Sequence, residues 1–104
     1  MTPFKTVEIP HLRHTVKFMD LSQLQGVEIK GSGCTAIEDE NTTLVFFEDI
    51  ENTVTDINLA PWVAHELVHV LQILCEKISA NFTNEQEHMA YLMHYLFTNL
   101  IDSE

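Results

Sequence analysis

The segment from Pro61 to Ile78 constrains the fold most, because it has a helical pattern and apolar residues cover most of its circumference. These residues are Trp62, Val63, Leu67, Val68, Val70, Leu71, Ile73 and Leu74. Such a helix is expected to be largely buried, so the rest of the 104-residue chain must cover it. Asn58 suits the N-cap, which puts Pro61 in the first turn, where its missing N–H does no harm.

One narrow polar stripe interrupts this apolar surface. At about 100° per residue, His65, His69, Gln72 and Glu76 fall on one line along the helix, with Glu66 beside it. Polar groups in apolar surroundings need partners. Two interpretations follow: the stripe faces water while the other side of the helix lies in the core, or the stripe belongs to a metal site.

A second long helix is expected near the C-terminus. The stretch Thr83–Gln86 has the Thr-x-x-Gln form of a capping box, so this helix should begin near Asn84 or Glu85. Its polar stripe consists of Glu87, Tyr91, His94 and Thr98. Its apolar side consists of Met89, Leu92, Met93, Leu96, Phe97 and Leu100. The two apolar faces are expected to pack together.

The first half of the chain has the pattern of β-strands. The strand-like segments are 4–9, 14–20, 34–37 and 43–47, which alternate or are rich in β-branched and aromatic residues. Residues 21–27 suggest one short helical turn, and the polar stretch 38–41 predicts a hairpin between the last two strands. The chain should therefore form a single α+β domain over residues 1–104. We expect a short antiparallel sheet of about three strands followed by two long packed helices.

The charge balance excludes some classes of partner. Lys and Arg number 5 against 16 Asp and Glu, for a net charge of −11. This argues against nucleic acid phosphates and anionic membrane surfaces, and it favours solubility and cationic partners. No apolar run approaches the ~20 residues of a membrane span, and no signal peptide is visible, so we expect a cytoplasmic protein. Cys34 and Cys75 are then expected as free thiols.

The first helix contains the pattern His-Glu-x-x-His at His65, Glu66 and His69. Two histidines one helical turn apart can aim their imidazoles at one ion, and the intervening glutamate can reach a metal-bound water without ligating the metal. A catalytic zinc usually has a third protein ligand. Glu87 is favoured for this role over Glu85, because Glu85 lies nearer the cap, where an acid suits the helix dipole without any function.

These residues resemble a known family. His-Glu-x-x-His on one helix, with a ligand glutamate on the next, resembles a minimal zincin of the gluzincin type. The stretch from Glu87 to Leu92, with Ala90 and Tyr91, is similar to small proteins of tailed phages and prophages. The position after the ligand glutamate is commonly small in that family, whereas here it is His88.

The resemblance implies a Zn²⁺ ion held by His65, His69 and Glu87, with Glu66 as the general base. Tyr91 is the preferred hydrogen-bond donor to a developing oxyanion, with His94 and Tyr95 as alternatives. In zincins a peptide substrate lies along the edge strand of the sheet, for which residues 43–47 are the nearest segment here. The composition of this segment favours the alternative, an ordinary core strand.

Two functions follow from these residues. The first is a zinc-dependent hydrolase, in particular a metallopeptidase acting on a protein or peptide in the cytoplasm, or in the host cytoplasm if the chain is phage-encoded. The second is a non-catalytic protein with the zincin fold that acts on a host protein by occupancy. The sequence leaves the substrate and the oligomeric state open.

Overall fold

A computed structural model of the chain describes residues 2–24, 33–77 and 86–101, and for residues 86–88 it describes the backbone only. Its sheet contains β1 (Lys5–Ile9), β2 (His14–Asp20), β3 (Gly33–Asp39) and β4 (Thr42–Phe47). The strand order is β1-β2-β4-β3. The β1–β2 and β3–β4 pairs are antiparallel, and β2 and β4 are parallel. The α+β class is thus as expected.

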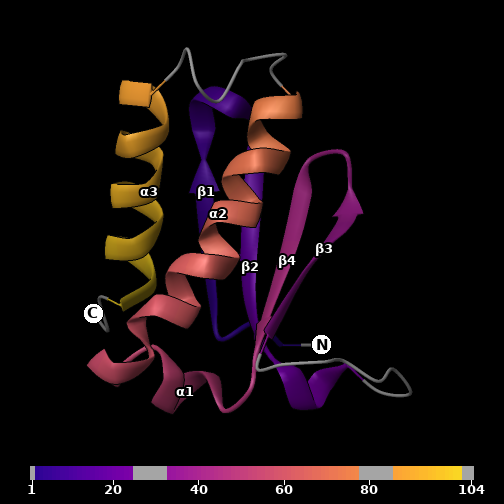
Figure 1. Cartoon of the computed structure of the whole chain (residues 1–104). Helices are drawn as coiled ribbons and strands as arrows, with labels where there is room; N and C mark the ends of the chain where they lie inside the picture. Colours follow the sequence, from indigo (N-terminus) through magenta and orange to yellow (C-terminus); the bar gives the residue numbers. More distant parts are fainter. Residues whose placement is uncertain (1, 25–32, 78–85, 102–104) are drawn as a thin grey trace.

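The sheet is mixed and four-stranded, whereas the sequence pattern predicted about three antiparallel strands. The predicted hairpin is present, since β3 and β4 pair across a tight turn in which the Asn41 amide donates to Asp39 Oδ1 at 2.8 Å. The hairpin places β4 beside β2 and leaves β3 at the edge (Figure 1). Residues 43–47 therefore belong to an inner strand, as the alternative of an ordinary core strand predicted, and not to an edge strand. Local alternation specifies a strand but not which distant strand pairs with it.

The helical part begins earlier than the sequence pattern predicted. A short helix α1 (Ile50–Thr53) and a 3-10 turn (Ile57–Leu59) precede α2 (Ala60–Lys77). Asp56 caps the 3-10 turn, because its carboxylate accepts the Asn58 amide at 2.9 Å. Asn58, the expected N-cap of the long helix, lies inside that turn. The predicted end of this helix at Ile78 and the predicted starts of the next one at Asn84 or Glu85 lie outside the described residues.

The last helix, α3 (Gln86–Ile101), runs antiparallel to α2, and both cover the same face of the sheet (Figure 1). Alternate strand residues supply one side of the core: Val7, Ile9, Val16, Phe18, Val45 and Phe47. The helices supply the other side: Val63, Leu67, Val70, Leu71, Leu74, Met89, Leu92, Leu96 and Leu100. A fully buried side chain of this kind contributes about 1.5–3 kcal/mol relative to an exposed one, so this layer is the main source of stability.

Helix α2 is buried on one side only. Trp62 is 53% exposed and Val68 36% exposed, although the apolar circumference predicted a largely buried helix. The core covers one side of α2, and the polar stripe with Trp62 lies on the other. None of the helices in the described part of the chain is both long and apolar enough to span a membrane.

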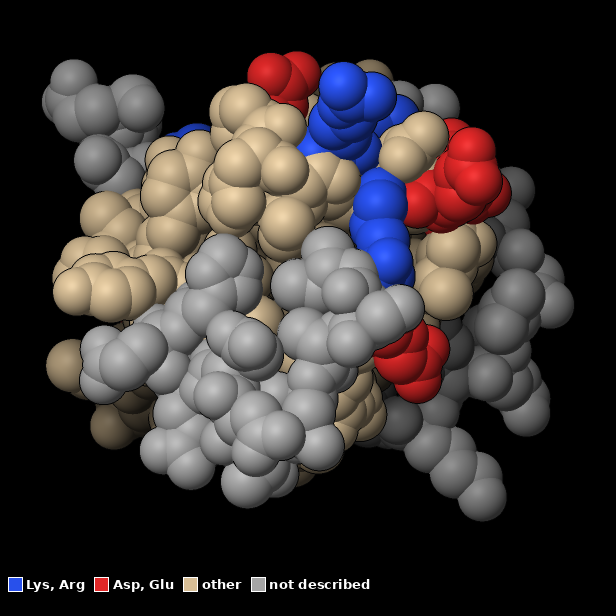
Figure 2. All heavy atoms as spheres, turned by 90° about the horizontal axis from the view of Figure 1, so that it is seen from above, with Lys and Arg blue, Asp and Glu red and all other residues tan. Residues whose placement is uncertain are grey.

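The C-terminal end of α2 is fixed by Lys77. Its ammonium donates to Asn41 Oδ1 at 2.8 Å and to the Glu40 carbonyl at 3.0 Å, and it lies 3.1 Å from His14 Nδ1. On the other side of the ring, Nε2 lies 2.7 Å from Thr43 Oγ1. Burial of the ring and the neighbouring ammonium lower the pKa of His14. Figure 2 looks onto this end of the molecule, where Lys and Arg side chains lie among Asp and Glu. These contacts connect the end of α2 to His14 of β2 and to the turn between β3 and β4.

Candidate metal centre

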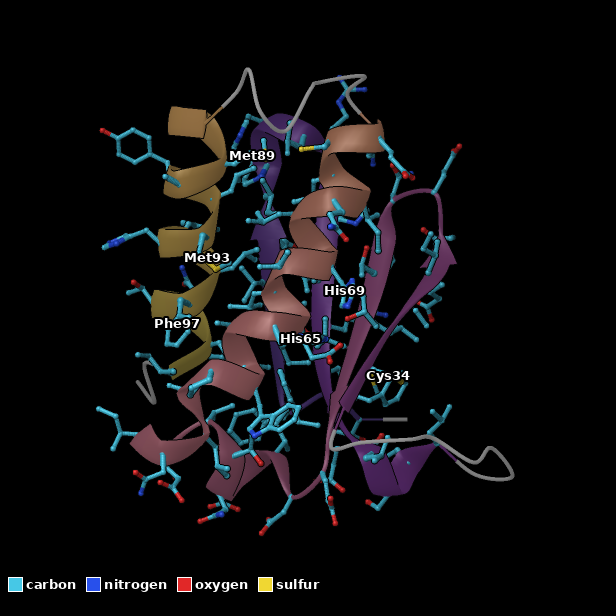
Figure 3. The ribbon with its side chains drawn as sticks, in the orientation of Figure 1. Cys34, His65, His69, Met89, Met93 and Phe97 are labelled. Carbon is cyan, nitrogen blue, oxygen red and sulfur yellow. The ribbon has the colours of Figure 1, made fainter. Side chains whose placement is uncertain are left out.

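The two histidines of the polar stripe lie close together on the exposed side of α2. The centroids of the His65 and His69 rings are 5.0 Å apart, with an interplanar angle of 80°. Two imidazoles bound tetrahedrally to one zinc ion, with Zn–N of about 2.0–2.1 Å, would have ring centroids about 5 Å apart. Figure 3 shows both side chains on the flank of α2 that faces β3 and β4. The spacing of the two rings therefore fits a shared metal ion.

A hydrogen bond orients one of the two rings. His69 Nδ1 lies 3.3 Å from Gln72 Oε1. An amide oxygen can only accept, so this contact is made by the tautomer with the proton on Nδ1. The lone pair of Nε2 then points away from the helix and is free for a ligand. Metal-binding histidines are commonly oriented in this way by a second hydrogen bond.

Glu66 lies under the histidine pair and is only 7% exposed. The Thr35 hydroxyl on β3 donates to its Oε1 at 2.9 Å. Its second oxygen, Oε2, lies 4.0 Å from His65 Nε2. One carboxylate oxygen is thus held by the sheet, and the other faces the space beside the imidazoles.

Gly33 makes room for this arrangement. A Cβ atom at this position would lie 2.8 Å from the Phe46 carbonyl oxygen and 3.4 Å from Glu66 Cγ. The first distance is shorter than side-chain carbons tolerate. The absence of a side chain at Gly33 therefore lets α2 bring its carboxylate close to the hairpin.

These residues line one open cavity of about 440 Å³. Its walls are Gly33, Cys34 and Thr35 from β3, and His65, Glu66, His69, Gln72, Ile73 and Glu76 from α2. The whole predicted polar stripe thus reaches a single cavity. Burial and the Glu66 carboxylate raise the pKa of the Cys34 thiol, so Cys34 stays protonated near neutral pH.

No third metal ligand for the histidine pair is found among the described side chains. In residues 2–24, 33–77 and 89–101 no three His, Cys, Asp or Glu side chains are grouped closely enough to hold a metal ion. The side chain of Glu87, the expected ligand, and the whole of Glu85 lie outside the described part of the chain.

Tyr91 lies away from the histidine pair. It is 72% exposed and lines a separate cavity of about 420 Å³ with Ile9, Pro10, His11, Leu92, His94 and Tyr95. Figure 3 shows α3, which carries it, on the opposite flank of α2 from His65 and His69. The Tyr95 hydroxyl donates to the Glu8 carbonyl at 2.8 Å. The structure therefore does not bring Tyr91, or the alternative donors His94 and Tyr95, to the cavity of the histidine pair.

The residues that sequence reasoning missed come from β3. Thr35 holds Glu66, Gly33 leaves space for it, and Cys34 completes the wall. The sequence predicted a strand from residue 34 onward, but it carried no signal that this strand would lie beside α2. Cys75 does not line this cavity and lies in the core, where its thiol donates to Met89 Sδ at 3.1 Å.

A scan of the chain against protein-family models found no match, and searches of curated proteins and of solved structures found none either. The resemblance to zincins therefore depends on the motif residues alone.

Proposed function

We propose that the protein is a zinc-dependent hydrolase of the metallopeptidase class. The observation that carries the proposal is the arrangement of His65 and His69, whose rings are 5.0 Å apart above a buried glutamate in the same cavity. A buried carboxylate is costly without a cationic partner, and Thr35 satisfies only one of the two oxygens of Glu66. A cation at the imidazoles would supply that partner.

The residues divide the work between binding and proton transfer. His65 and His69 would hold the metal through ring nitrogens, with Glu87 as the proposed third ligand. When bound, zinc would supply a Lewis acid that polarises a carbonyl and lowers the pKa of a water molecule towards ~7. Glu66 Oε2 would accept the proton of that water and later pass it to the leaving amine. The Thr35 hydroxyl keeps Oε1 occupied, so Oε2 is the oxygen that would act on a substrate.

Metal analysis and calorimetry with zinc test the first half of the proposal. We expect one zinc ion per chain in the unchanged protein and a loss of affinity of about 100-fold or more in His65→Ala and His69→Ala. Gln72→Ala should lose less, about tenfold, because it removes only the orienting hydrogen bond. A purified protein that neither contains zinc nor binds added zinc would rule the proposal out.

Glu66→Gln tests the second half. The amide keeps the shape of the side chain but cannot accept a proton, so peptide hydrolysis should fall by at least about 100-fold while zinc binding persists. Hydrolysis of a peptide library by the unchanged protein is the measurement, and the same assay with excess chelator is the control.

A second function, binding of a host protein by occupancy without catalysis, has one observation in its favour. No tyrosine or histidine of α3 within the described residues reaches the cavity to donate to an oxyanion. A biological effect that survives Glu66→Gln would select this function over the hydrolase.

A further inference from the structure

The polar stripe of α2 extends one turn beyond the metal centre, to an exposed aromatic residue. Trp62, His65, His69, Gln72 and Glu76 are separated by alternating steps of three and four residues, so they lie along one side of the helix. Trp62 is the only tryptophan of the chain and is 53% exposed. Its indole therefore presents apolar surface to solvent on the same side of α2 as the polar stripe.

Trp62 forms one wall of a cavity of about 250 Å³. The other lining residues are Glu48, Asp49, Asn52, Thr53 and Leu59. Pockets for drug-sized ligands measure about 300–1,000 Å³, so this volume suits a single long side chain better than a whole small molecule. The cavity continues the same side of α2 that carries the histidine pair, one helical turn away from it.

The carboxylates of this cavity are available to a ligand. Asp49 stands at the N-cap position of α1, yet its side chain makes no capping hydrogen bond. Glu48 contributes only its backbone carbonyl, which accepts the Thr53 hydroxyl at 2.6 Å. Across the described ranges, neither carboxylate takes part in an ion pair. Carboxylates and an indole that line one cavity are the groups that recognise a guanidinium or ammonium group.

We propose that the Trp62 cavity binds the basic side chain, Arg or Lys, of a polypeptide, and so makes the protein selective for basic segments. The cation stacks on the indole of Trp62 while Glu48 and Asp49 accept its hydrogen bonds. The net charge of −11 attracts such segments from a distance. The proposal that this polypeptide is also the substrate of the candidate metal centre rests on the proposed function. The binding of a basic side chain in the Trp62 cavity does not.

Fluorescence of the single tryptophan provides the test. The full chain, freed of metal, is titrated with short acetylated and amidated Ala/Gly peptides that contain one Arg, one Lys, or one citrulline, the neutral isostere of Arg. The Arg and Lys peptides should change the Trp62 emission saturably, with the citrulline peptide at least about tenfold weaker. Equal affinity of the Arg and citrulline peptides, or no binding of either, would overturn the proposal.

Substitutions locate the binding. Glu48→Gln combined with Asp49→Asn should weaken the Arg peptide about tenfold, and Asn is chosen because Asp49 has a φ of 46°, a backbone conformation that Asn tolerates. Glu51→Gln is the matched control, because Glu51 is an exposed acid of α1 outside the cavity lining, and its effect should stay within about twofold. A loss in Glu51→Gln equal to that of the double variant would indicate general charge attraction and refute the site.

The same titration separates this proposal from the proposed function. His65→Ala combined with His69→Ala should keep the affinity for the Arg peptide, because the two histidines line a different cavity. Trp62→Leu, followed by calorimetry instead of fluorescence, should lose Arg-peptide binding and keep zinc binding. Loss of zinc binding in Trp62→Leu, or of peptide binding in the histidine variant, would contradict a separate basic subsite.

Discussion

Thr35, on the edge strand β3, donates a hydrogen bond of 2.9 Å to Oε1 of Glu66, which lies between the two histidines of α2. The contact joins residues 31 positions apart and holds α2 against the β3–β4 hairpin. It also leaves one carboxylate oxygen to the cavity and ties the other to the sheet. The proposed base is therefore held by the fold rather than by its own helix.

Thr35→Val should lower the free energy of unfolding by about 1–3 kcal/mol, because it leaves the buried Oε1 of Glu66 without its donor. Thr35→Ser restores a hydroxyl and should recover most of that loss. Urea unfolding of the two variants measures the difference. Equal stability of the Val and Ser variants would show that the hydrogen bond contributes nothing.

Gly33→Ala should destabilise the fold by about 1–3 kcal/mol, because the added Cβ would lie 2.8 Å from the Phe46 carbonyl oxygen and force β3 and β4 apart. Ile37→Ala is the control on the same strand: Ile37 is 63% exposed, so its truncation should cost about 0.5 kcal/mol or less. Thermal unfolding of both variants decides, and a Gly33→Ala protein as stable as the parent would contradict the close packing seen here.

The sequence predicted the part of the site that depends on one helix. A period of 3.6 residues places His65, His69, Gln72 and Glu76 on one side of α2, and the structure finds all four in one cavity. Metal binding by these residues stays a prediction, as does the role of Glu87.

The parts that depend on tertiary placement were not predictable. Nothing in the local pattern specifies that β4 inserts between β2 and β3, because pairing partners of distant strands are set by packing. The packing of α3 against α2 was not predictable either. Tyr91 was expected at the candidate metal centre, but the structure places it in another cavity. The polar residues of α3 follow the helical spacing that the sequence predicted. Which side of α2 they face depends on how the two helices pack against each other.

The one-sided burial of α2 gives a prediction about its apolar residues. Leu74 is fully buried, so Leu74→Ala should cost about 2–5 kcal/mol through lost transfer energy and a cavity. Val68→Ala should cost about 0.5 kcal/mol or less, because Val68 is 36% exposed. Denaturant unfolding measures both. Comparable losses at the two positions would contradict the one-sided burial of α2.

The contact between His14 and Lys77 predicts how stability changes with pH. Burial and the Lys77 ammonium hold the folded-state pKa of His14 below 6.5, its ordinary value. As the pH falls through about 6.5, the unfolded chain therefore binds the proton before the folded one does. The stability contributed by neutral His14 is fully present above this pH and declines as the pH falls towards the folded-state pKa.

Lys77→Met and His14→Gln separate the causes. Removing the ammonium in Lys77→Met should raise the pKa of His14 towards 6.5 but not to it, because desolvation by burial remains the larger effect. An NMR titration of the His14 ring measures this shift. In His14→Gln, the drop in the free energy of unfolding between about pH 8 and about pH 5 should be smaller than in the parent. A pH dependence identical in the two proteins would show that His14 is not a source of the acid sensitivity.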